Sequence, residues 1–145
     1  MLRITKETEY AFMLLGEVLA ADGAAKNTAY LAGRTRIAVP MSGKVLKRLT
    51  QRGILESIRG AYGGYQLARD AAAITALDVV EAMEGAPELV ECAGGDNNCA
   101  LVEHCRLSPF WLSLNDDIRA LLAGKTLADM QRDEHYTEKE RSKAS

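Results

Sequence analysis

Residues 39–68, VPMSGKVLKRLTQRG followed by ILESIRGAYGGYQLA, decide the fold of this chain. The first half predicts a helix, because a proline suits the first helical turn and a glycine, Gly53, suits its end. Three apolar side chains of this helix are expected to face inward: Val45, Leu46 and Leu49. The second half predicts a hairpin made of a strand (54–58), a glycine-rich turn (59–64) and a returning strand (65–68).

Two more helices are predicted upstream of this stretch. Apolar residues recur at helical spacing after Thr5 as far as Asp22-Gly23, which indicates a first helix of about four turns. Asn27 or Thr28 then caps a short second helix that ends near Arg34. Three helices followed by a hairpin are typical of a winged helix-turn-helix, a mainly α fold with a small β-hairpin, whose third helix lies in the DNA major groove.

Basic residues are concentrated in the same region. Residues 26–69 carry nine Lys or Arg against one acid, Glu56, whereas the rest of the chain carries nine against nineteen and the whole chain has a net charge of -2. A basic block in an acidic protein favours a surface that binds double-stranded DNA, although a solvated helix face is the alternative. Ser42, Lys44 and Arg59 are the candidates for reading bases. Further contacts, mostly to phosphates, are expected from Arg36, Lys47, Arg48 and Tyr62.

Length and composition limit the remaining possibilities. With 145 residues, of which 48% are hydrophobic, the chain fits one compact domain with an appendage. It contains neither an apolar run of about 18 residues nor a charged and then apolar leader, so we expect no membrane span and a cytoplasmic, reducing location. An enzyme is the least favoured class, because two histidines outside any recognisable acid-base setting offer little for an active site.

Two further helices are predicted after the hairpin. Thr75 caps a short one that stops at Gly85, with Leu77, Val80 and Met83 facing inward. Ser108 and Pro109 begin a longer one with an apolar stripe made of Phe110, Leu114, Ile118, Leu121 and Leu122. A small domain hardly needs this stripe for its own core, so we expect it to pair two copies in a homodimer; packing on the same chain is the alternative.

All three cysteines, Cys92, Cys99 and Cys105, fall within 14 residues. An odd number of clustered thiols indicates a metal or cluster site, since they cannot all pair within one chain. Thiolates suit zinc, copper(I) and iron-sulfur clusters, and the gaps here do not follow the short paired spacing of structural zinc. An iron-sulfur cluster is therefore favoured. The alternatives are three reduced thiols in small apolar spaces and a cluster-free thiol or zinc redox switch.

Three features together resemble one family of regulators. They are the opening Met1-Leu2-Arg3-Ile4-Thr5-Lys6 with Tyr10-Ala11, the wing Arg59-Gly60-Ala61-Tyr62-Gly63-Gly64-Tyr65-Gln66-Leu67, and the cysteine loop before Ser108-Pro109-Phe110-Trp111. Over about residues 1–130 the chain resembles the winged-helix iron-sulfur regulators that include IscR and NsrR, and within them the regulator of the SUF assembly system. The resemblance implies a homodimeric transcription factor with a cluster on its three cysteines, 2Fe-2S rather than 4Fe-4S, that controls promoters of cluster-assembly genes.

The chain departs from this family at one ligand position. IscR-type members carry a histidine three residues after the third cysteine, where this chain has Ser108. The candidate substitutes are His104, His135, Glu7 and Glu9. His104 is awkward because it adjoins Cys105, and His135 lies in a polar tail that would be costly to order. The resemblance favours Glu9, which matches an acidic position that some NsrR-like members donate from the partner subunit; the alternative is a solvated carboxylate.

The predicted organisation has four parts. Residues 1–85 form the winged helix-turn-helix domain, 86–107 the cysteine loop, 108–130 the dimerisation helix and 131–145 a disordered tail. The signal sensed, the operator sequence and the direction of regulation are left open.

Overall fold

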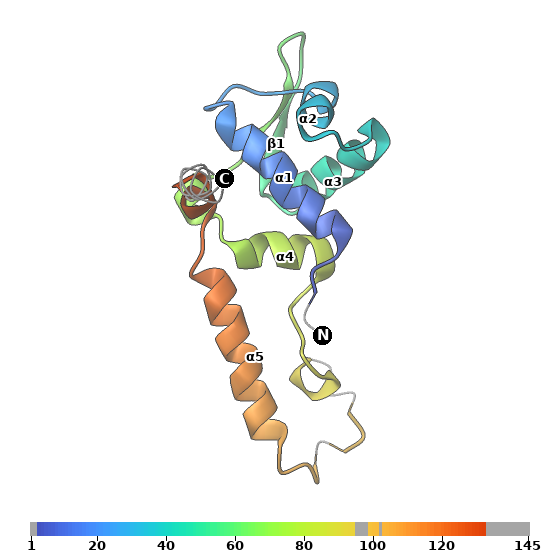
Figure 1. The fold of residues 1–145 in the computed structure, drawn as a ribbon, viewed down its shortest axis with the longest axis vertical. Helices are drawn as coiled ribbons and strands as arrows, with labels where there is room; N and C mark the ends of the chain where they lie inside the picture. Colours follow the sequence, from blue (N-terminus) through green and yellow to red (C-terminus); the bar gives the residue numbers. More distant parts are fainter. Residues whose placement is uncertain (1–2, 95–98, 102, 133–145) are drawn as a thin grey trace, which may run out of the picture.

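The computed structural model describes residues 3–94, 99–101 and 103–132. The α-helices are α1 (Lys6–Ala20), α2 (Thr28–Thr35), α3 (Val39–Gln51), α4 (Ala76–Glu84) and α5 (Ser108–Ala123). The strands are β1 (Leu55–Ile58) and β2 (Gly64–Leu67), and the short 3-10 helices are η1 (Ala71–Ala73) and η2 (Glu91–Ala93). Figure 1 shows α1 to α4 and the hairpin gathered in one body, from which α5 extends. This is the predicted winged helix-turn-helix with an additional helix.

Local sequence signals set the starts of the helices. The Thr5 side chain accepts a hydrogen bond from the backbone N–H of Thr8 at the start of α1, and Asn27 does the same for Tyr30 in α2. Thr75 and Asp78 form a reciprocal capping box at α4. The predicted helix starts in this body are therefore confirmed.

The hairpin is confirmed and is anchored to the linker between α1 and α2. Leu55 pairs with Leu67 and Ile58 with Gly64 in antiparallel register. The N–H of Lys26 donates to the carbonyl of Tyr65 at 3.1 Å, and the N–H of Tyr65 donates to the carbonyl of Lys26 at 2.8 Å. Gly64 has φ of +149°, and a Cβ there would lie 2.2 Å from the Lys26 carbonyl carbon, so glycine is needed where the wing meets this linker.

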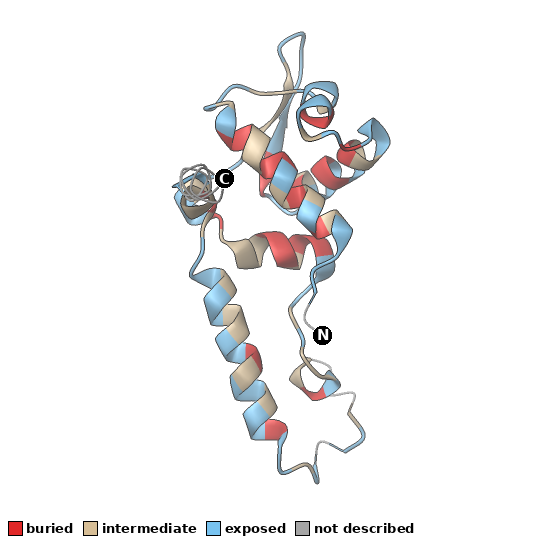
Figure 2. Ribbon diagram, in the orientation of Figure 1, coloured by how far each residue is buried: buried red, intermediate tan, exposed pale blue. Residues whose placement is uncertain are grey.

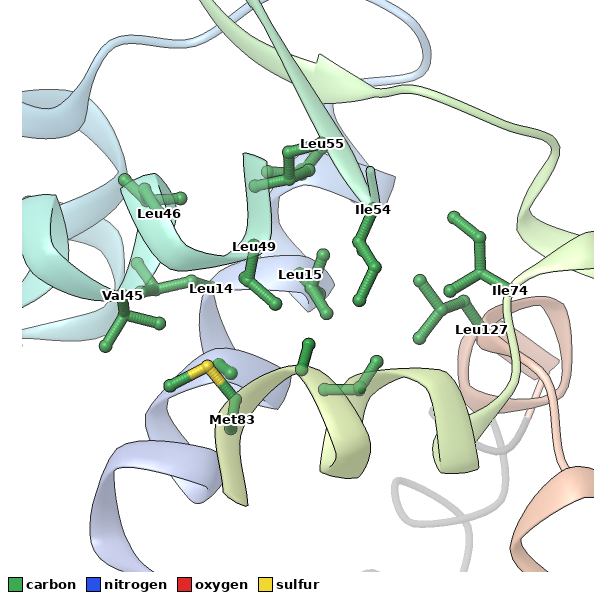
Figure 3. Packing of buried hydrophobic residues seen from close by; sticks show 14 of the residues in the cluster. Leu14, Leu15, Val45, Leu46, Leu49, Ile54, Leu55, Ile74, Met83 and Leu127 are labelled. Atoms are coloured by element: carbon green, nitrogen blue, oxygen red, sulfur yellow. The ribbon is translucent and has the colours of Figure 1, made fainter. Parts of the chain in front are cut away.

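The hydrophobic core lies between α1, α3, α4 and the base of the wing (Figure 3). Val45, Leu46 and Leu49 are buried as predicted, and Leu14 and Leu15 of α1 are fully buried too. The inner face of α4 differs from the prediction, because Val79 is buried whereas Leu77 is half-buried. Figure 2 shows buried residues concentrated in the body, with α5 largely exposed or half-buried.

The chain returns to this core after α5, which the sequence analysis did not anticipate. α5 ends at Ala123, and Leu127 is only 1% exposed. The N–H of Leu127 donates to the carbonyl of Ile74 at 2.9 Å, and the N–H of Ala76 donates to the carbonyl of Lys125 at 2.8 Å. The predicted dimerisation helix over 108–130 is therefore corrected: its last residues belong to the winged body, and residues 127–132 form a separate helical turn.

The start of α5 also differs in one detail. Ser108, predicted to cap this helix, is its first residue and is 8% exposed, while Leu107 is at the cap position without a side-chain hydrogen bond. Pro109 lies in the first turn as predicted. Most of the predicted tail, residues 133–145, lies outside the described residues. None of the helices in the described ranges is long and apolar enough to cross a membrane.

Candidate nucleic-acid interface and cysteine segment

The outer side of α3 carries the basic residues predicted to bind DNA. Lys44, Lys47 and Arg48 are exposed, on the opposite side from the buried leucines. Lys44 and Lys47 line an open hollow of about 560 Å³ between the start of α3 and Tyr65 of the wing. α3 and the wing thus line one concave surface that carries Lys44 and Lys47.

Ser42 does not belong to this surface. Its side chain is fully buried, and its hydroxyl donates a weak hydrogen bond to the Ile37 carbonyl at 3.5 Å. The prediction that Ser42 reads bases is therefore wrong, because the side chain points into the turn between α2 and α3.

The remaining predicted contacts flank α3. Arg36 is exposed between α2 and α3 and adopts the left-handed conformation with φ of 60°, which costs energy for a residue with a Cβ. Arg59 is exposed where the wing turn begins, and Tyr62 is 96% exposed, so no described part of the chain covers it. All three side chains are therefore accessible to a ligand from solvent.

Glu7, in the first turn of α1, pairs with two of these cations, and this pairing was not predicted from the sequence. Its Oε1 accepts a hydrogen bond from Lys44 Nζ at 2.8 Å, and its Oε2 lies 3.9 Å from Arg48 Nη1. The hydrogen bond and charge of Lys44 hold the pKa of Glu7 below its usual value. Arg48 Nη1 also donates to the Met83 carbonyl at 3.2 Å. No spacing in the sequence signals this contact, since 37 residues separate Glu7 from Lys44.

The three cysteines lie between α4 and α5 and carry free thiols. Cys92 is buried in η2, whereas Cys99 and Cys105 are half-buried. Among the described residues, no three Cys, His, Asp or Glu side chains are gathered as metal ligands. The chemistry of the donor set, three thiols without disulfides, nevertheless fits a soft metal or an iron-sulfur cluster.

Glu9 is exposed in the first turn of α1 and accepts a hydrogen bond from Lys6 Nζ at 2.7 Å. This end of α1 is fastened to the end of α4, because Glu84 Oε1 accepts hydrogen bonds of 2.6 Å from both the Thr5 N–H and the Thr8 hydroxyl. The cysteine segment leaves the body just after Glu84 (Figure 1). Thus the acidic turn of α1 and the root of the cysteine segment are neighbours, although the described residues do not bring Glu9 together with the thiols as a ligand set.

Among the described residues, α5 contacts its own chain through the side that carries Asn115 and Arg119. Asn115 is buried, and its side-chain oxygen accepts a hydrogen bond from the N–H of Leu89 at 3.1 Å. Arg119 pairs with Glu81 of α4 at 2.9 Å. The opposite side exposes two large apolar side chains: Phe110 is 59% and Leu121 is 73% exposed. The predicted stripe is therefore divided, with Leu114, Ile118 and Leu122 half-buried.

Comparison with known proteins agrees with this architecture. Residues 4–133 match the model of the Rrf2 family, described as iron-dependent transcriptional regulators. The chain belongs to the Rrf2 family. Protein aau3 of Rhizobium meliloti is similar at 31% identity over 89% of this chain and 84% of its own length. IscR of Escherichia coli is similar at 26% identity over 89% of this chain and 80% of its own.

A solved structure of another regulator has the same fold. CymR, the global cysteine regulator of B. subtilis, superposes with a TM-score of 0.70 at 26% identity, covering 91% of this chain and 98% of CymR. The predicted resemblance to IscR-type winged-helix regulators is confirmed. This Rrf2 chain is a DNA-binding transcriptional regulator, and the proteins it resembles are regulators rather than enzymes.

Proposed function

We propose that this Rrf2 protein is a homodimeric regulator of iron-sulfur cluster assembly (SUF) genes, acting in the cytoplasm on promoter DNA. Its operator binding is controlled by a cluster on Cys92, Cys99 and Cys105. The observation that carries the proposal is the presence of three free thiols in the segment between the DNA-binding body and α5 of a chain that matches an iron-dependent family. The family description and the similarity to IscR support the choice of iron.

The proposed ligand set contains one weak member. The three thiolates would hold the cluster, 2Fe-2S in preference to 4Fe-4S, and Glu9 of the partner subunit would complete it. Ser108, at the position of the IscR-type histidine, is buried and offers no comparable ligand. A carboxylate is a hard ligand beside thiolates, so its release would be the sensing event of a cluster that supplies redox chemistry when bound.

The proposed DNA face comprises the accessible residues of α3 and its flanks. Lys44, Lys47 and Arg48 would contact the major groove and its phosphates, while Arg59 and Tyr62 of the wing would contact the adjacent backbone. Arg36 would add a phosphate contact at the start of α3. The support for this assignment is the exposure of all six side chains, together with the position of Lys44 and Lys47 at the hollow between helix and wing.

The proposed dimer uses the open side of α5. Phe110 and Leu121 expose large apolar side chains on a helix that extends from the body, which is costly for a monomer in water. We expect analytical ultracentrifugation to give a dimer, and Leu121→Asp to give a folded monomer. Ala123→Asp, at another exposed position of α5 outside the stripe, is the matched control. A native chain that sediments as a monomer would refute this part of the proposal.

The test of the cluster is anaerobic purification followed by a visible spectrum with iron and acid-labile sulfide assays on one sample. Brown protein with matching iron and sulfide is expected, and Cys99→Ala should lose both. Glu103→Gln, in the same segment but without a thiol change, should keep them. Glu9→Gln should lower cluster retention on dilution, whereas Glu17→Gln on the same helix should not. Equal iron content in all three Cys→Ala variants would refute the assignment.

A cluster-free thiol or zinc switch on the same scaffold is the second candidate. It is favoured by the half-buried state of Cys99 and Cys105, which leaves both thiols accessible to reagents. Colourless protein after reconstitution, with zinc or free thiols, would support this candidate and remove the role proposed for Glu9.

A further inference from the structure

The first turn of α1 places a negative charge on the cations of the DNA face. Glu7 accepts the hydrogen bond from Lys44 and lies near Arg48, as described above. The contact is accessible, because the Lys44 side chain is 62% exposed and that of Glu7 is 33% exposed. A phosphate group can therefore approach the same ammonium from solvent.

We infer that Glu7 is an intramolecular competitor of the DNA phosphate: its carboxylate occupies Lys44 and Arg48 in the free protein and weakens DNA binding. The inference rests on the proposed DNA face. The inference adds to that face an acidic residue that lowers the affinity of the regulator for DNA.

Binding of DNA to this face exchanges one anion for another on Lys44. A carboxylate and a phosphate both form charge-assisted hydrogen bonds with an ammonium group, so binding DNA replaces one anion by another on Lys44. A lysine without an internal partner would contribute its whole interaction with the phosphate to the free energy of DNA binding. Here, part of that free energy is lost in breaking the contact between Glu7 and Lys44. In addition, a phosphate that reaches Lys44 lies near the Glu7 carboxylate, and the two like charges repel each other.

A second contact keeps Arg48 within reach of Glu7. Because Arg48 Nη1 donates to the Met83 carbonyl, its guanidinium is held from the side of α4 while Glu7 lies 3.9 Å away. A guanidinium has five N–H donors and can serve a phosphate with the others. Arg48 is thus shared between Glu7 and the Met83 carbonyl, whereas Lys44 forms the direct hydrogen bond with Glu7.

The test compares the affinity of the full-length chain and its variants for a labelled duplex of mixed sequence, by fluorescence anisotropy over a range of salt concentrations. Phosphate contacts are independent of sequence, so no operator is required. Glu7→Gln should bind about two- to five-fold more tightly at low salt, as expected for release from one exposed ion pair. The gain should shrink at high salt, because exposed charges are then screened.

Two controls separate local competition from a general charge effect. Glu17→Gln makes the same change of net charge on the same helix, where Glu17 accepts a hydrogen bond from Arg34 at 3.0 Å, and it should leave the affinity near that of the native chain. In a Lys44→Ala background, Glu7→Gln should lose most of its effect, because interacting residues are not additive.

Each outcome decides the inference. An equal gain from Glu17→Gln, or a full gain in the Lys44→Ala background, would show a long-range charge effect and overturn it. Weaker binding by Glu7→Gln would mean that Glu7 positions Lys44 for DNA, which also overturns it. Native protein that binds and a Glu7→Gln variant that matches it would refute this inference alone, whereas a native chain that binds no duplex would refute the DNA face as well.

Discussion

Replacing Leu127 by alanine tests whether the segment after α5 holds the winged body together. Leu127 is 1% exposed and packs beside Ile74 in the core (Figure 3). Truncating a buried leucine to alanine costs about 2–5 kcal/mol in lost burial and residual cavity. The melting temperature of a chain of this size falls by roughly 2–4 °C for each kcal/mol. We therefore expect Leu127→Ala to lower it by about 6–12 °C, for a cost of about 3 kcal/mol.

The assay is thermal unfolding followed by circular dichroism at fixed protein concentration. Met13→Ala is the matched control, because Met13 is 42% exposed on α1 and its truncation should change stability by no more than about 0.5 kcal/mol. If Leu127→Ala unfolded at the temperature of the native chain while retaining its helical signal, residues 125–130 would not belong to the core. A drop of equal size in Met13→Ala would also refute the reasoning, since it would show that burial does not determine the cost.

Two other substitutions give predictions of a different kind. Arg36→Gly should raise the free energy of unfolding by about 1 kcal/mol, because glycine adopts the left-handed conformation at φ of 60° without strain. The same variant should lower DNA affinity and reduce the salt slope by about 0.9, and unchanged binding would remove Arg36 from the DNA face. Glu84 has a pKa below its usual value: burial alone would raise it, but hydrogen bonds from the Thr8 hydroxyl and the Thr5 N–H outweigh burial. Stability from Glu84 is therefore present above the ordinary glutamate pKa of about 4.3 and lost as pH falls through the lower folded pKa. Chemical denaturation between about pH 3 and 6 should show that the free energy of unfolding falls less steeply with decreasing pH in Glu84→Gln than in the native chain. Identical pH dependence in the two proteins would contradict this account.

The local elements of this protein were predictable because each is set by residues close together in the sequence. Asn27 and Thr75 cap their helices as expected, α1 begins just after Thr5 as its apolar pattern predicted, and the buried leucines of α3 follow helical spacing. The hairpin followed from its glycines, and the family from the wing together with the cysteine loop. A sequence signal was also present for the turn after α5, because Thr126 and Asp129 repeat the capping box of Thr75 and Asp78.

Contacts between distant residues were decided by the tertiary structure. The burial of Ser42 depends on how α2 meets α3, and the place of Leu127 depends on α5 returning the chain to Ile74. The pairing of Glu7 with Lys44 joins two helices whose relative rotation no periodicity encodes. Periodicity and capping determine which face of a helix is apolar and where the helix begins. Which charged groups meet across helices follows only from packing. Local residue patterns therefore account for the winged fold and the thiol segment, whereas the packing of the helices settles which cations of the DNA face already have an internal partner.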